Sequence, residues 1–102
     1  MKEYDIFLPL WKNDGMRIDP DRLQEVRQEL LAEFGGITSF PQPNLGFCKL
    51  GDITYRDEVI IYRVLAPEST KAREFFVGLK ERLKAELGQV DVLIVERDVV
   101  AL

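Results

Sequence analysis

The segment that decides the fold is residues 59–65, Val-Ile-Ile-Tyr-Arg-Val-Leu (VIIYRVL). β-Branched and aromatic side chains favour a pleated strand, and Pro67 marks where this strand stops because proline donates no amide hydrogen bond. A strand with one face in water alternates apolar and polar residues, but this segment contains Arg63 as its only charged residue. We therefore expect both faces of this strand to be shielded from water.

Three more strands are predicted on either side of this segment. Residues 4–10 place apolar side chains at every second position, which indicates a strand with Asp5 and Phe7 on the opposite face. Residues 37–50 are interrupted by Pro-Gln-Pro-Asn at 41–44, so we expect an irregular edge strand there. Residues 90–96 (VDVLIVE) predict a last strand whose faces are both apolar.

Two amphipathic helices are predicted between the strands. Asp19 is placed to cap the first helix and Pro20 to occupy its first turn, while Gly35 can adopt the left-handed conformation that ends it. Ser69 or Thr70 can cap the second. The apolar stripes of the two helices recur at helical spacing and comprise Leu23, Val26, Leu30, Leu31 and Phe34, and Ala72, Phe75, Phe76, Leu79, Leu83 and Leu87.

The order strand, helix, strand, strand, helix, strand predicts an α+β fold of the ferredoxin-like βαββαβ class. We expect a four-stranded antiparallel sheet with both helices on one face, and a single domain over residues 1–102 because a second core would leave each half too small. The short apolar segment 99–102 can add an extra strand. The first helix is acidic and the second basic, so neighbouring helices would complement each other; a basic docking face on the second helix is the alternative.

Composition excludes several classes of function. The chain has no histidine, which removes histidine-based nucleophilic catalysis and the ordinary zinc sites, and its single cysteine, Cys48, cannot form an intramolecular disulfide. A net charge of −4 disfavours nucleic acid and anionic lipid as partners. No segment is apolar for long enough to cross a membrane, and the first ten residues lack a signal-peptide pattern, so we expect a cytoplasmic protein.

Because only one face of the sheet can be covered by two helices, a second copy of the chain is the simplest cover for the other face. We therefore expect a homodimer, with Phe7 in the core or at this interface. The alternative is that long side chains such as Arg63 and Tyr62, or the irregular segment 41–55, cover the face of a monomer. The residues that would line a pocket for a small carboxylate or planar ligand on the open face, or serve as interface anchors, are Trp11, Tyr55, Tyr62 and Arg63.

No catalytic residue, metal site or cofactor is predicted. Asp52, Asp57 and Glu58 surround one loop, but their spacing matches no calcium-binding loop, and they are interpreted as solvated turn residues. Residues 6–10 share an aromatic with the first-strand motif of RNA-recognition domains, yet residues 59–65 lack the second motif of those domains.

The chain resembles a group of short bacterial proteins of unknown function. The resemblance rests on residues 7–10 (FLPL), the Asn-Asp-Gly turn at 13–15, residues 34–38 (FGGIT) and the acid-flanked third strand, and it spans nearly the whole chain. It implies the ferredoxin-like fold and no catalytic residue. The leading hypothesis is thus a non-enzymatic, homo-oligomeric binding or interaction module. The alternative is a small enzyme or small-molecule sensor, akin to dimeric α+β barrel proteins, that uses an open-face pocket.

Overall fold

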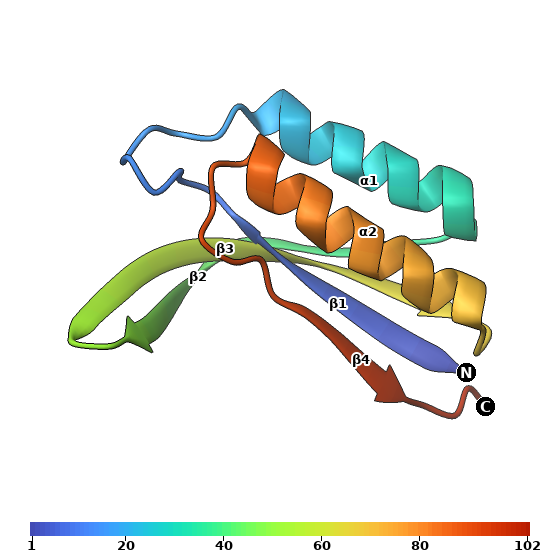
Figure 1. Cartoon of the computed structure of the whole chain (residues 1–102). Coiled ribbons are helices and arrows are strands. Elements are labelled where there is room, and N and C mark those ends of the chain that lie inside the picture. Colours follow the sequence, from blue (N-terminus) through green and yellow to red (C-terminus); the bar gives the residue numbers. More distant parts are fainter.

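The computed structural model describes all residues, 1–102, and contains four strands and two helices in the predicted βαββαβ order. Figure 1 shows the two helices side by side on one face of the sheet. The elements are β1 (Lys2–Pro9), α1 (Pro20–Phe34), β2 (Thr38–Leu50), β3 (Ile53–Ala66), α2 (Thr70–Glu86) and β4 (Ile94–Asp98).

The sheet has the strand order β2-β3-β1-β4, and every neighbouring pair is antiparallel. Strands β1 and β2 therefore run parallel with β3 between them, and β3 and β4 run parallel with β1 between them. Each helix thus connects two parallel strands that are separated by one other strand, which places β1 and β3 at the centre of the sheet. The predicted α+β class with four antiparallel strands and two helices is confirmed.

The core lies between the helices and the sheet. Strand β1 shows the predicted alternation, and β3 likewise buries alternate residues against the helices, although its sequence had led us to expect burial of both faces. The Tyr4 ring stacks on the Phe76 ring of α2 with centroids 4.0 Å apart, and the Tyr62 hydroxyl donates a hydrogen bond to the Leu23 carbonyl of α1 at 3.1 Å. The fully buried side chains of this core include Ile6, Leu8, Val64, Leu30, Leu79 and Leu83.

The helix ends follow the sequence signals. The Asp19 carboxylate accepts a hydrogen bond from Asp21 N, and Gly35 ends α1 with a φ of 77°. The Ser69 hydroxyl accepts one from Ala72 N and caps α2. Two ion pairs join the helices: Arg82–Glu29 links the basic helix to the acidic one as predicted, whereas Arg22–Glu86 has its charges in the opposite sense.

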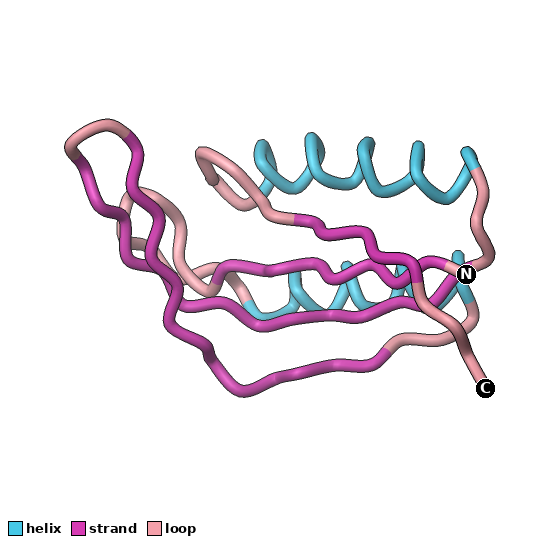
Figure 2. The backbone as a smooth tube through the Cα atoms, turned by 90° about the horizontal axis from the view of Figure 1, so that it is seen from below, coloured by secondary structure: helices cyan, strands magenta, loops and turns pink.

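Strands β2 and β3 form a hairpin that is longer than predicted. Their register shifts between Phe40 and Asn44, so the expected irregularity at residues 41–44 is confirmed as a local break in the pairing. Beyond the end of β1 at Pro9 the hairpin continues as a two-stranded ribbon to its turn at Gly51, which has a φ of 62°. Figure 2 shows this ribbon curving away from the rest of the sheet.

The predicted start of the last strand was wrong. Strand β4 begins at Ile94 rather than at residue 90, because residues 88–93 connect the end of α2 to the sheet edge and bury Val92 in the core on the way. Residues 99–102 form no extra strand. Val99 N donates a hydrogen bond to Met1 O at 3.0 Å.

Candidate functional site

The face of the sheet opposite the helices carries a row of apolar side chains across all four strand positions. Phe40 of β2 pairs with Ile61 of β3, and Ile61 pairs with Phe7 of β1. Phe7 N donates to Leu93 O at 3.0 Å, which places Leu93 next in line, just before β4. We call these four residues the apolar row. Its two ends are open to solvent, because Phe40 is 39% and Leu93 52% exposed.

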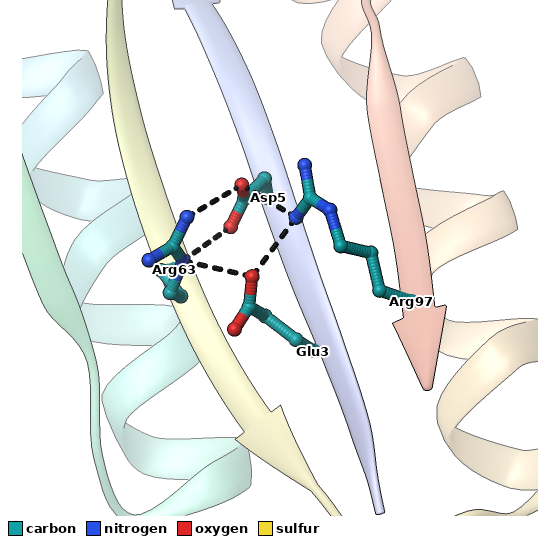
Figure 3. A network of polar contacts seen from close by, with 4 residues as sticks. All are labelled: Glu3, Asp5, Arg63 and Arg97. Atoms are coloured by element: carbon teal, nitrogen blue, oxygen red, sulfur yellow. Dashed lines mark hydrogen bonds and ion pairs between the residues drawn. The ribbon is translucent and has the colours of Figure 1, made fainter. Parts of the chain in front are cut away.

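Beside the apolar row, two carboxylates and two guanidinium groups form a closed ionic cluster (Figure 3). Arg63 of β3 holds Asp5 of β1 with two hydrogen bonds, of 2.8 and 3.0 Å. Arg97 of β4 donates to Asp5 at 2.8 Å and to Glu3 at 2.9 Å, and Arg63 Nε lies 3.1 Å from Glu3. The cluster therefore ties the three strands β3, β1 and β4 together on their open face.

The charges of the ionic cluster are paired with one another. The hydrogen bond from Arg63 lowers the pKa of Asp5, and the hydrogen bond from Arg97 adds to this effect, against a desolvation that acts in the opposite direction. Two positive and two negative side chains cancel. The Arg63 guanidinium also lies 5.0 Å from the Phe40 ring centroid, a cation–π contact that joins the cluster to the apolar row.

A second feature is a cavity of about 380 Å³ at the edge of the sheet, which we call the notch. It lies between the loop at 11–15 and residues 55–58 of β3, where the ribbon leaves the sheet. Its walls include two aromatic and four charged residues, namely Trp11, Tyr55, Lys12, Arg56, Asp57 and Glu58. Burial raises the pKa of Asp57, and the neighbouring charge of Glu58 acts in the same direction.

The structure separates the five residues that the sequence singled out. Phe7 and Arg63 lie on the open face, whereas Trp11 and Tyr55 line the notch. Placing Tyr62 on the open face was wrong: its side chain is buried among the helices, because adjacent residues of a strand point to opposite faces. The predicted pocket that combines Trp11, Tyr55 and Arg63 is therefore not formed.

Sequence reasoning missed the ionic cluster, in which Arg63 and Arg97 pair with both Glu3 and Asp5. It also missed Phe40 and Leu93 as the two ends of the row that contains Phe7. Each of these contacts crosses from one strand to another, so it depends on the register between strands. The one available signal was the parity of β1, which had already placed Asp5 and Phe7 on the same face.

Comparison with protein-family models, with curated proteins and with solved structures finds no match to the chain. Neither helix has the combination of length and apolar character that a membrane-spanning segment needs. The function proposed below therefore rests on the residues and contacts of this chain.

Proposed function

We propose that the protein is a homodimeric interaction module of the ferredoxin-like class, in which two copies pack against each other through the open faces of their sheets. Two features support the class: both connections cross one intervening strand, and both helices lie on the same side. The observation that carries the dimer is the apolar row. The proposal includes no catalytic step.

Burying the apolar row would stabilise an assembly in which the open face is covered. Side chains from Phe40 to Leu93 form an unbroken line across the sheet, and burial stabilises by about 25 cal/mol for each Å² of apolar surface. An exposed contiguous apolar patch typically marks an interaction site, whereas scattered apolar residues do not. A two-fold axis through this face would set the row of one copy against the row of the other.

The ionic cluster favours a second copy of the chain as the occupant. Because its two positive and two negative groups are already paired, covering it leaves no charge without a partner. A strongly charged partner would gain nothing from a neutral face. A second copy of the chain presents an equally neutral ionic cluster, so neither copy places an unpaired charge against the other.

The dimensions of the face fit a modest interface. Four strands spaced by about 4.8 Å and eight residues of about 3.3 Å each give a face of roughly 19 by 26 Å, or about 500 Å² in projection. A standard interface buries about 800 Å² on each partner. The uneven surface of the side chains and the exposed residues on the same face of the ribbon, Leu50 and Ile53, can supply the difference.

The test is the mass in solution, measured by size-exclusion chromatography with light scattering at micromolar concentration. We expect twice the mass of one chain for the wild type, and the mass of one chain for Leu93→Asp, which introduces a charge at the exposed end of the apolar row. Val77→Asp is the matched control: Val77 is 61% exposed on α2, away from the sheet, so this variant should remain dimeric.

Circular dichroism would establish that both variants fold. A monomeric wild type would overturn the proposed dimer. A wild type and a folded Leu93→Asp variant that are equally dimeric would show that the interface lies elsewhere.

A further inference from the structure

The notch is held open by contacts that do not depend on a ligand. Lys12 N donates to Met16 O at 2.7 Å, which closes the loop on itself. Asn13 N donates to Gly88 O at 3.1 Å, and the Gln89 side chain donates to Trp11 O at 2.8 Å. Residues 88–89, after α2, therefore hold the loop at 11–15 in place. A preformed wall is typical of small-molecule sites, because little chain entropy is lost on binding.

The opposite wall of the notch is a strand edge without a neighbouring strand. The Glu58 carbonyl accepts a hydrogen bond from Leu10 N at 2.9 Å, so it faces the side of β1. In a β-strand, the N–H and C=O groups of residues two positions apart point to the same side. The N–H and C=O of Arg56 therefore point to the same side as the Glu58 carbonyl, into the notch. Strand β1 has already ended at Pro9, and it offers Arg56 no partner.

The charged side chains of the notch are unpaired. Lys12, Arg56, Asp57 and Glu58 line it, and none of the four takes part in an ion pair within the chain. This contrasts with the open face, where every charge of the ionic cluster has a partner. The notch thus offers both positive and negative groups to a ligand.

Two aromatic rings complete the notch. Trp11 is 38% and Tyr55 40% exposed, and they come from the two opposite walls, the loop and β3. Arg17 lies over the Trp11 ring, 5.2 Å from its centroid, and thereby covers part of this residue. The exposed parts of both rings provide flat apolar surface next to the charged groups.

We propose that the notch binds a small zwitterion with a planar apolar group, the chemical class of the aromatic amino acids. The ammonium group would bind Asp57, the carboxylate would bind Lys12 and Arg56, and the ring would lie against the aromatic side chains. A cavity of about 380 Å³ lies within the range of small-ligand pockets, about 300–1,000 Å³. This site involves neither the apolar row nor the ionic cluster, so it goes beyond the proposed dimer.

L-Phenylalanine is the probe, and Trp11 is the reporter because it is the only tryptophan in the chain. Its fluorescence can be excited at wavelengths that phenylalanine does not absorb. We expect a saturable change with a dissociation constant of about 0.1–1 mM, typical of a small ligand in an open site. Phenethylamine lacks the carboxylate and 3-phenylpropionate lacks the amine, so each should bind at least about tenfold more weakly.

Two variants test the charged groups separately. Asp57→Asn keeps the oxygen that accepts from Glu58 N at 2.9 Å and should still fold, while Arg56→Gln alters an exposed side chain. Each should weaken L-phenylalanine binding by about tenfold. Glu33→Gln, an exposed carboxylate of α1, is the control and should leave the affinity unchanged.

Three results would overturn the proposal: no saturable change at tens of millimolar, equal binding of either analogue, or full affinity in Asp57→Asn. The dimer is tested independently, because Leu93→Asp should lose the dimer and still bind L-phenylalanine. Failure of the one proposal is therefore distinguishable from failure of the other.

Discussion

Replacing Asp5 by asparagine should destabilise the fold substantially, because this carboxylate is the centre of the ionic cluster. Its side chain is 3% exposed and accepts three hydrogen bonds, two from Arg63 and one from Arg97. Asparagine has nearly the same shape but carries no charge, and its amide group would point hydrogen atoms at one of the guanidinium groups. The substitution therefore removes the charge complementarity and little of the packing.

The magnitude follows from the contacts. A hydrogen bond to a charged group contributes about 1.5–3 kcal/mol, so three give a gross loss of about 4.5–9 kcal/mol. The side chains of Arg63 and Arg97 are 36% and 44% exposed, so they can turn to water or to Glu3 and recover part of this loss. We expect a net decrease of about 2–4 kcal/mol in the free energy of unfolding, out of a total of about 5–15 kcal/mol.

The assay is urea unfolding at several pH values, followed by circular dichroism. The pKa of Asp5 is lowered in the folded state, so its stabilising contribution is fully present above the pKa of the unfolded chain, near pH 4. That contribution is lost as the pH falls through the lower pKa of the folded state. The difference between wild type and Asp5→Asn should therefore be largest at neutral pH and should shrink below about pH 4.

A difference of less than about 1 kcal/mol at pH 7 would refute the reasoning, since it would mean that the buried contacts contribute no more than a surface ion pair. A difference that stays the same down to about pH 2 would also contradict it. Asp98→Asn is the control on the same sheet. Asp98 is 84% exposed and pairs with Lys2 at the surface, so its replacement should change the stability by no more than about 1 kcal/mol.

Three further predictions concern Tyr62, Tyr4 and the cap of α2. Tyr62→Phe removes the hydrogen bond to the Leu23 carbonyl and should lower the free energy of unfolding by about 1 kcal/mol in urea titrations, with no change in the far-ultraviolet spectrum. Burial, with a further contribution from the hydrogen bond to Glu96, raises the pKa of Tyr4 to about 12. Its phenol should therefore ionise near that pH, which an absorbance titration of the wild type against Tyr4→Phe measures. The stability that the raised pKa provides should be lost between about pH 10 and 12. Ser69→Ala removes the cap of α2 and should lower the melting temperature by about 4–8 °C, equivalent to about 1 kcal/mol, whereas Ser69→Asp should retain the cap.

Local patterns were sufficient for the order of the elements and for most of their ends. Asp19, Gly35 and Ser69 mark helix boundaries because capping depends on residues within one turn of each other. The alternation in β1 showed which of its side chains face the helices, because successive side chains of any extended chain point to opposite faces. The same alternation contradicts our grouping of Tyr62 with Arg63, so that error lay in applying the pattern.

The boundaries of β2, β3 and β4 were less predictable, because strand length depends on whether a partner is present. Asp57 and Glu58 were interpreted as solvated turn residues, which was wrong, because pairing with β2 makes them part of β3. Residues 90–93 are apolar enough for a strand, but they form the connection from α2 and bury Val92 in the core instead.

The amino-acid sequence settled which segments become helices and strands and which of their faces are apolar, because both follow from interactions between residues a few positions apart. Tertiary structure alone brought Asp5 to Arg63 and Arg97, and Phe40 to Ile61 and Phe7. Those contacts, like the two walls of the notch, require the register between strands, which is set by the packing of the whole core and leaves no local pattern.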